Sequence, residues 1–249
     1  MTLDRLYDLL LVAQFVSAAG VFVALYFITA PYGRHVHIGW GPLMPARLGW
    51  VVMELPAVVV IALLWATGTP KLVGTIFLCI WELHYLQRTF IFPLLMRGGR
   101  GIPVLIVLFS VMFNVMNGFI NGWYLYHRAL YEDSWLSDPR FVVGLLIFIA
   151  GFVINLHSDH VLRTLRKPGE TDYRIPMRGF HLFVASPNYL GELLEWSGWA
   201  LLTWSLPGLA FALFTAANLV PRAHAHWQWY RRTFPDYPPE RRRIIPFIY

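Results

Sequence analysis

The chain has 249 residues, of which 57% are hydrophobic and only 14% are charged, and its mean hydropathy is +0.52. A soluble domain carries about a quarter charged residues, so the composition excludes an ordinary water-soluble protein. The net charge of +6 is mostly a signal of membrane topology, and we expect no nucleic-acid partner.

Long uncharged runs mark the membrane segments. Leu9–Ala30 and Ile102–His127 contain no Asp, Glu, Lys or Arg, and each is long enough for the roughly 20 residues that cross a bilayer as a helix. In chain order, helices are predicted at about residues 8–30, 50–66, 72–95, 102–127, 141–166, 180–204 and 208–232. The predicted fold class is therefore an all-α membrane protein with seven transmembrane helices, forming a single domain over residues 1–249.

The distribution of basic residues predicts the orientation. With seven spans, the N-terminal side collects Arg5, Lys71, Arg128 and Arg140. The opposite side collects Arg34, Arg47, Arg97, Arg100, Arg163, Arg166, Lys167, Arg174, Arg178, Arg222, Arg231, Arg232, Arg241, Arg242 and Arg243. Because cytoplasmic loops carry an excess of Lys and Arg, this bias predicts an N-terminus outside or in the lumen and a C-terminus in the cytoplasm. The protein is expected in a bacterial inner membrane or the endoplasmic reticulum membrane.

Six charged residues fall inside or at the edges of the predicted spans: Glu54, Glu82, Arg88, Asp159, Glu192 and Glu195. Each costs about 3 kcal/mol at mid-membrane on insertion scales. They must be paired with one another, neutralised or turned toward a wet cavity.

One polar stripe favours a large anionic ligand. Asn155, Asp159, Arg163 and Arg166 are spaced i, i+4, i+8 and i+11 along one helix face. Amide and carboxylate groups suit adenine and ribose, whereas Arg suits phosphate oxygens. The alternative, positive-inside bias alone, explains the arginines but not Asn155 and Asp159.

Two further polar faces are present. Asn188, Glu192 and Glu195 form a second stripe, which opens with Ser186-Pro187, a signal for a helix start or a break in a helix beside a cavity. The third face consists of Asn114, Asn117 and Asn121. Amides of this kind are common contacts between helices, and both a structural and a functional role stay open for them.

Several enzyme classes are excluded by absent motifs. No Gly-x-Gly-x-x-Gly follows a strand, and no Ser-centred nucleophile elbow occurs. The nine histidines are scattered, and their closest pairs, His157/His160 and His224/His226, are too few for a di-iron centre. Redox or group transfer with a soluble organic cofactor remains, and no metal site is expected.

The polar stripes lie within longer motifs that occur in order along nearly the whole chain. These are Leu43–Arg47, Glu54–Pro56, His84–Phe90, Asn155–Asp159, Leu162–Glu170, Tyr173–Pro176, Asn188–Glu192, Glu195-Trp196 and the terminal Ile245–Tyr249. On these motifs the chain resembles the steroid 5α-reductase family (3-oxo-5α-steroid 4-dehydrogenases), and the type 2 enzyme most closely. Met53 departs from the Gln of the type 2 pattern. Met96 replaces the family's Asn in a loop that has one inserted residue. The resemblance therefore supports a cofactor-binding role for Arg100 less strongly than for the other arginines.

The resemblance implies a seven-helix reductase with NADPH among the cytoplasmic halves of the helices and a 3-keto-Δ4 steroid entering from the bilayer. It implies that the chain is an oxidoreductase acting on CH–CH groups in steroid metabolism. By the same resemblance, the cofactor-binding residues are Arg100, Asn155, Asp159, Arg163, Arg166, Tyr173, Asn188, Glu192, His226 and Tyr230. Glu54 and Tyr85 would hold the substrate ketone as catalytic residues, and Phe113 and Trp196 would line the steroid slot. Plain packing is the alternative for these two aromatic residues.

The implied chemistry is consistent with these residue types. Reducing an enone takes a hydride at the β-carbon, which a nicotinamide supplies, a donor to the enolate oxygen and a proton at the α-carbon. A phenol and a protonated carboxyl group can supply the hydrogen-bond donors to the enolate oxygen in a dry site. The partners expected are the steroid and membrane lipid, and the chain is expected to be a monomer.

Alternative functions remain open at this point. The first is a reductase of another lipid enone, such as a sterol-ring or enoyl-thioester reductase. A membrane methyltransferase would leave the Asn155–Arg166 stripe without phosphates to bind. A transporter would use the buried carboxyl groups as an ion path, but no inverted repeat is present.

Overall fold

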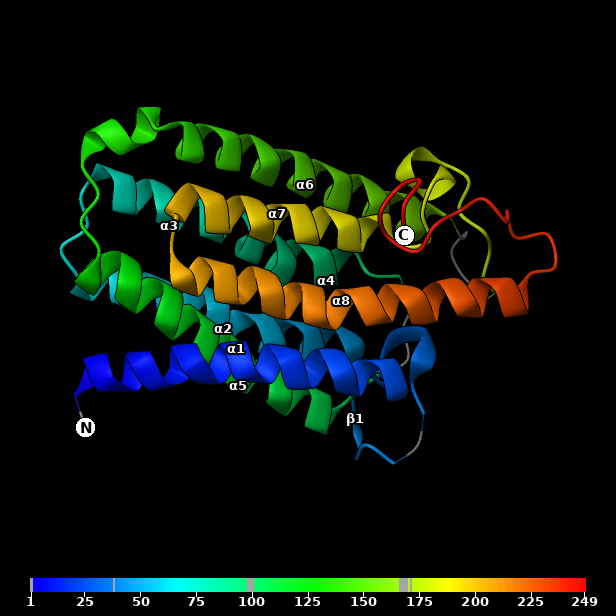
Figure 1. The fold of residues 1–249 in the computed structure, drawn as a ribbon. Coiled ribbons are helices and arrows are strands. Elements are labelled where there is room, and N and C mark those ends of the chain that lie inside the picture. Colours follow the sequence, from blue (N-terminus) through cyan, green and yellow to red (C-terminus); the bar gives the residue numbers. More distant parts are fainter. Residues whose placement is uncertain (1, 38, 98–100, 166–169, 171) are drawn as a thin grey trace.

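A computed structural model describes residues 2–37, 39–97, 101–165, 170 and 172–249. Over this part of the chain, seven helical segments run side by side as an elongated bundle (Figure 1). They are α1 (Leu3–Phe27), α2 (Ala46–Thr67), the run of α3 (Leu72–Leu86), π-helical η2 (Gln87–Ile91) and α4 (Phe92–Leu95), α5 (Val104–Trp123) with its π-helical end η3 (Tyr124–Arg128), α6 (Pro139–Thr164), α7 (Pro187–Thr203) and α8 (Leu206–Thr233).

Short elements join the helices at the two ends of the bundle. Single 3₁₀ turns form at η1 (Gly33–His35), η4 (Asp133–Ser137) and η5 (Gly179–Leu182). Strand β1 (Leu43–Met44) pairs antiparallel with β2 (Ile102–Pro103), with Leu43 opposite Pro103 and Met44 opposite Ile102. The start of α1 and the end of α8 lie at opposite ends of the bundle (Figure 1).

Within the described residues, five helices are long and apolar enough to cross a membrane: α1, α2, α5 with η3, α6 and α8. Their lipid-facing sides carry large apolar residues, including Leu9 at 62%, Phe109 at 54% and Leu146 at 62% exposure. In water such a surface would be strongly unfavourable, whereas in hydrocarbon it costs nothing. The chain is therefore a multi-pass integral membrane protein of the all-α class.

Each predicted helix has a counterpart, but two sets of bounds were wrong. The first helix runs from Leu3 to Phe27 rather than from 8 to 30, because Thr2 caps its start: its hydroxyl accepts from the backbone N–H of Arg5 at 3.4 Å. The sixth predicted helix, α7, begins at Pro187 rather than at 180, because Pro187 occupies the first helical turn and Ser186 before it has a non-helical backbone. The predicted crossing by seven helices stays a prediction, since α3 is only 15 and α7 only 17 residues long.

Glycines let α6 and α7 approach closely. Gly151 of α6 faces Gly191 of α7. A Cβ on Gly191 would lie 2.7 Å from the Gly151 carbonyl oxygen and 2.6 Å from the backbone nitrogen of Asn155. Gly144 and Gly198 repeat this contact two turns further along. Such small-residue contacts are a usual way for membrane helices to pack. Here they bring the polar stripes of the two helices side by side.

Candidate active site

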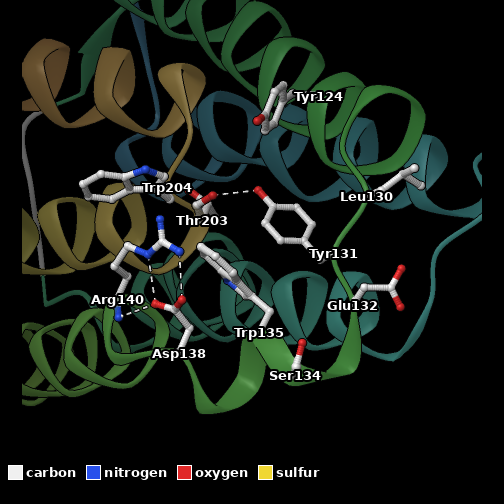
Figure 2. A pocket seen from close by; sticks show the side chains of 10 residues that line it. All are labelled: Tyr124, Leu130, Tyr131, Glu132, Ser134, Trp135, Asp138, Arg140, Thr203 and Trp204. Atoms are coloured by element: carbon white, nitrogen blue, oxygen red, sulfur yellow. Dashed lines mark hydrogen bonds and ion pairs between the residues drawn. The ribbon is translucent and has the colours of Figure 1, made fainter.

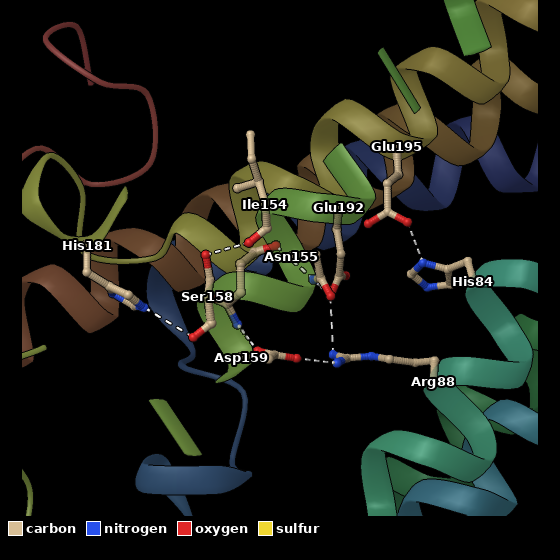
Figure 3. Close-up of polar contacts among 10 residues, drawn as sticks. His84, Arg88, Ile154, Asn155, Ser158, Asp159, His181, Glu192 and Glu195 are labelled. Carbon is tan, nitrogen blue, oxygen red and sulfur yellow. Dashed lines mark hydrogen bonds and ion pairs between the residues drawn. The ribbon is translucent and has the colours of Figure 1, made fainter. Parts of the chain in front are cut away.

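Arg88 is the centre of a buried charged cluster. Its guanidinium lies 3.1 Å from Asp159 on α6 and 3.1 Å from Glu192 on α7, as Figure 3 shows. The π-helical turn η2 bears Arg88, and such turns recur at functional sites. Trp50 and Phe92 cover its guanidinium at 4.8 and 4.4 Å from their ring centres. The arrangement holds one guanidinium and two carboxyl groups together inside the bundle.

Amide groups complete this cluster. Asn155 donates to the Asn188 carbonyl at 3.0 Å and to Glu192 at 3.3 Å, and Asn188 donates to Asp159 at 3.3 Å. Five residues of the two predicted stripes and η2 thus form one network. Four of the predicted cofactor residues (Asn155, Asp159, Asn188 and Glu192) are therefore together, and in this structure they bind one another.

A second group of predicted cofactor residues lies beside the first. On α8, His226 shares a hydrogen bond of 3.2 Å with Ser186 and stacks on Tyr189 at 5.4 Å, which joins it to the start of α7. Arg34 lies over the rings of Tyr230 and Tyr173, at 4.8 and 5.4 Å from their centres.

The first loop contributes residues that sequence reasoning did not select. Arg34 had counted only toward topology, and His35 had not been considered. His35 stacks on His226 at 5.3 Å. Arg34 Nη1 and His35 Nε2 are buried without a hydrogen-bond partner in the described part of the chain. Burial and the neighbouring Arg222 and Arg34 charges lower the pKa of His35 to about 4, so its ring is neutral at pH 7.

The remaining predicted cofactor residues are arginines. Arg163 lies one turn beyond Asp159 on α6 and contacts His160 Nδ1 at 3.2 Å. Arg100 and Arg166 fall outside the described residues.

The two predicted catalytic residues come from different helices. Glu54 lies on α2, which continues through Pro56 as a helix, and one of its carboxyl oxygens accepts from the Asn114 amide at 3.4 Å. Tyr85 lies on α3 and is 3% exposed. The two side chains are within electrostatic reach of each other and of Arg88. Glu54, Tyr85 and the charged cluster therefore lie near one another inside the bundle.

An aromatic wall extends from Tyr85. Its ring packs on Trp196 at 5.5 Å, Trp196 packs on Phe211 at 4.2 Å, and Phe211 on Phe113 at 6.1 Å. The two residues predicted to line a steroid slot, Phe113 and Trp196, thus belong to one aromatic cluster with Tyr85, which also packs on Trp81 at 4.9 Å. Tyr85, Trp196 and Phe211 are buried in this cluster.

His84 and Glu195 stand behind this wall. His84 lies beside Glu195 (Figure 3), with Nδ1 2.6 Å from Glu195 Oε2. The imidazole packs edge-on to Trp196, with ring centres 4.7 Å apart. From the sequence, Glu195 was one of six charged residues that needed a partner, neutralisation or a wet cavity, and His84 had no predicted role. Nothing in the spacing could reveal the pair, because its two members are 111 residues apart.

Asn117 and Asn121, left open by the sequence, serve as contacts between helices. Gln14 donates to Asn117 at 3.1 Å, Asn121 donates to Asn117 at 3.1 Å, and Trp199 donates to Asn121 at 3.0 Å. These bonds join α1, α5 and α7, away from the Arg88 cluster.

Comparison with known proteins shows the family of the chain. The sequence profile of the family described as 3-oxo-5-alpha-steroid 4-dehydrogenase matches residues 100–249. The chain belongs to this family. It is 42% identical to the human 3-oxo-5-alpha-steroid 4-dehydrogenase 1 over 250 residues, covering 99% of this chain and 96% of the relative. It is 46% identical to the human 3-oxo-5-alpha-steroid 4-dehydrogenase 2 over 223 residues, covering 88% and 87%. A plant relative, the steroid 5-alpha-reductase DET2 of Gossypium hirsutum, is 39% identical over 254 residues, covering 99% and 98%.

The likeness to 3-oxo-5-alpha-steroid 4-dehydrogenases extends over nearly the full length of these relatives. The resemblance inferred from the motifs is therefore confirmed, and the chain is an oxidoreductase of this family. The roles of the individual site residues stay predictions.

Proposed function

We propose that the chain reduces the Δ4 double bond of a 3-oxo-Δ4-steroid to a 3-oxo-5α-steroid, with NADPH as the electron donor. The observation that carries this proposal is the position of Tyr85. Its buried side chain packs on the aromatic ring of Trp196 and lies within electrostatic reach of Glu54 and of the Arg88 cluster. A ketone at one end of a flat apolar molecule would meet both oxygen donors there.

Glu54 and Tyr85 act on the substrate ketone in this proposal. Bound NADPH would supply the hydride for the β-carbon. As electrons move toward the ketone oxygen, the Tyr85 hydroxyl and the protonated Glu54 carboxyl donate hydrogen bonds to it and stabilise the enolate. The Asn114 side-chain amide donates to one Glu54 carboxyl oxygen at 3.4 Å and to the Met53 carbonyl at 2.7 Å. The first of these bonds orients the carboxyl group. The surrounding aromatic rings exclude water, which strengthens these hydrogen bonds.

The residues present fit a dinucleotide phosphate. Arg34 Nη1 is a buried donor without an acceptor among the described residues, and His35 Nε2, also without a partner there, is a donor in the tautomer that carries the proton on Nε2. Phosphate oxygens are suitable acceptors for both. Tyr173, His226 and Tyr230 offer ring faces next to them. The network of Asn155, Asp159, Asn188 and Glu192 would exchange some of its internal bonds for ribose and amide groups. Arg163, and also Arg100 and Arg166 from the sequence, would add positive charge for the 2′-phosphate.

The same proposal includes seven membrane crossings with a cytoplasmic C-terminus. The continuous run from Leu72 to Leu95 in α3, η2 and α4 is about 36 Å long at roughly 1.5 Å per residue, enough for a span. The 17 residues of α7 give about 25 Å, and a short span of this kind is accommodated by local thinning of the bilayer. An odd number of crossings agrees with the opposite positions of the start of α1 and the end of α8 (Figure 1). The steroid would enter from the bilayer into a monomer.

Turnover by purified protein tests the proposal. The protein in detergent is mixed with NADPH and, in separate reactions, with Δ4-3-ketosteroids, a sterol with a ring double bond and an enoyl thioester. Formation of 5α-reduced 3-ketosteroids, with loss of cofactor absorbance in equal amount, is the expected result. Reduction of only the sterol or thioester would instead support the alternative lipid-enone reductase.

A further inference from the structure

The segment Ile245–Tyr249, which takes no part in the proposed chemistry, folds into a closed turn with an apolar tip. The Ile245 N–H donates to the Tyr249 carbonyl at 2.8 Å, and the Tyr249 N–H donates to the Ile245 carbonyl at 3.0 Å. Phe247 and Ile248, at the tip between these bonds, are each 77% exposed. The turn therefore holds two large apolar side chains on the outside of the molecule, and exposed apolar surface of this kind marks a contact with a membrane or a partner.

The tip continues into a larger apolar surface at η5 and the residues after it. Phe183 packs on Phe247 with ring centres 5.6 Å apart, and on Phe180 at 6.4 Å. A parallel bridge between Val184 and Arg242 holds the two segments side by side (Figure 1). The exposed apolar residues of both segments form one surface, the apolar cap, which consists of Phe180, Leu182, Phe183, Phe247 and Ile248.

Tyr249 places the apolar cap at the level where α1 leaves the hydrocarbon. Its hydroxyl lies 3.2 Å from that of Tyr26, in the last turn of α1. This helix is one of those able to cross a membrane, and its outer side stays apolar to the end, with Phe27 85% and Ile28 52% exposed. Tyrosine gathers where the hydrocarbon meets the headgroups. The tip beside Tyr249 therefore projects at the edge of the bilayer rather than into bulk water.

The two segments that form the cap are basic. Arg178 comes directly before η5, and Arg242 and Arg243 come shortly before the tip, whereas Glu240 is the single acid in residues 177–183 and 240–249. Arg178 and Arg242 are exposed, and neither forms an ion pair with a described residue. A second copy of the chain would bring these like charges together, which disfavours it as the occupant of the cap.

Basic residues at the opposite end of the bundle have acidic partners. Lys71, Arg128 and Arg140 lie 3.3, 2.7 and 2.8 Å from a carboxylate. Figure 2 shows the last of these pairs, in which Asp138 binds the Arg140 guanidinium that lies over Trp135. The exposed arginines beside the cap lack such a partner within the described chain, so an anion from outside the protein is the suitable one. Apolar side chains next to free arginines are typical of an element that lies in the interface of an anionic membrane.

We propose that the apolar cap inserts into the membrane interface and that Arg178 and Arg242 bind the headgroups of anionic phospholipids. The cap is then a membrane anchor in addition to the transmembrane helices. It holds the segment that leads into α7 through Ser186, whose hydroxyl shares a hydrogen bond with His226. Insertion of the cap does not depend on steroid reduction and is measured without substrate or cofactor.

Spin labels on the full-length chain, reconstituted in lipid vesicles, measure the insertion. Cys79, the single cysteine, is replaced by serine, and a nitroxide is attached to Ile248→Cys or, in a second variant, to Phe183→Cys. Asp236→Cys, in an exposed turn after α8, is the matched control. The two cap labels should be more accessible to oxygen, which concentrates in hydrocarbon, than to a water-soluble neutral nickel complex, and the control label should show the reverse. Cap labels as accessible to nickel as the control, or shielded from both reagents by another protein surface, would overturn the proposal.

The lipid headgroup is tested with vesicles of phosphatidylcholine alone and of an equal mixture with phosphatidylglycerol. The Ile248→Cys label should be less accessible to the nickel complex in the mixture. One arginine at an anionic surface changes such an equilibrium by about fivefold, so Arg242→Gln should lower the ratio of inserted to exposed cap by this factor in the mixture and leave it unchanged in phosphatidylcholine. Arg232→Gln, in the last turn of α8, is the control and should have no effect. Equal accessibility in both vesicles, or equal effects of the two arginine changes, would refute the binding of anionic headgroups.

Discussion

His84 and Glu195 share a hydrogen bond of 2.6 Å inside the bundle, where Glu195 is fully buried and His84 is 4% exposed. The other carboxyl oxygen of Glu195 has no hydrogen-bond partner among the described residues. The bond joins α3 to α7 directly behind Tyr85 and Trp196. It therefore sets the distance between the two helices that bear the proposed substrate contacts.

Loss of this pair should destabilise the protein. Glu195→Ala leaves the imidazole without a partner in a dry environment, and removal of one member of a buried pair costs about 3–5 kcal/mol. We expect a clearly lower unfolding temperature in detergent, and a smaller loss for Glu195→Gln, which keeps a hydrogen-bonding side chain. Ser197→Ala, on the exposed face of the same helix, is the control and should unfold like the unmodified chain. An unfolding temperature of Glu195→Ala equal to that of the control would contradict the role of the pair.

A cytoplasmic C-terminus is the second prediction. It follows from the basic bias of one side of the predicted topology, because Lys and Arg are retained on the cytoplasmic side. Reporter fusions after Tyr249 should give the cytoplasmic signal, and fusions before α1 the opposite one. An extracytoplasmic signal after Tyr249 would rule out the seven-span orientation.

The helices were predictable, and the contacts between them were less so. Uncharged runs and Pro or Gly signals located each helix because the bilayer imposes a length and a composition on every span. The stripe of Asn155 and Asp159 was visible because its members recur on one helix face. Their partner Arg88 was seen only as a charge in need of compensation, since a single sequence does not say which helices are neighbours.

Loop residues were the hardest to interpret. Arg222 is 5% exposed and donates to the Tyr189 hydroxyl at 2.8 Å and to the Ala30 and Tyr32 carbonyls at 3.1 Å. In the sequence it was one of many arginines that the positive-inside rule explains. The first loop folds onto α8 through these bonds, and no pattern in the sequence indicates such a contact.

Preference for NADPH over NADH is the third prediction. A 2′-phosphate adds charge-assisted contacts to arginines, each worth about 1.5–3 kcal/mol, or about ten- to a hundredfold in affinity. Arg163→Gln should raise the KM for NADPH more than the KM for the steroid, in steady-state kinetics with each varied in turn. Arg232→Gln, which changes an exposed arginine in the last turn of α8, should leave both values unchanged. Equal efficiency with NADPH and NADH would refute the prediction.

His181 should make the stability pH-dependent. Burial lowers its pKa from 6.5 to about 4, and its ring contacts the Ser158 carbonyl at 3.4 Å, next to Asp159 (Figure 3). The folded protein thus takes up a proton less readily than the unfolded chain. The stability that the neutral ring provides is complete above pH 6.5 and declines as the pH falls from 6.5 to 4, by at most about 3 kcal/mol at 1.36 kcal/mol per pKa unit.

Unfolding temperatures between pH 7.5 and 4 check this effect. His181→Gln removes the titrating group, so its unfolding temperature should fall less over this range than that of the unmodified chain. His160→Gln is the control, because His160 is exposed and its removal should leave the slope unchanged. Parallel curves for His181→Gln and the unmodified chain would exclude His181 as the source.

Glu54 and Tyr85 provide the test of the proposed chemistry. Tyr85→Phe keeps the ring that packs on Trp196 and removes only the hydroxyl, while Glu54→Gln keeps a weaker donor at the same place. Removal of one donor to a developing oxyanion typically costs about 10²–10³ in turnover, so each variant should lose activity by this order while it still folds and binds NADPH. Because both groups act on one oxygen, the double variant should lose less than the product of the two single losses. A turnover rate of either single variant within about threefold of the unmodified chain would be a far smaller loss than removal of one donor causes. That residue would then only connect helices, and other groups would hold the ketone.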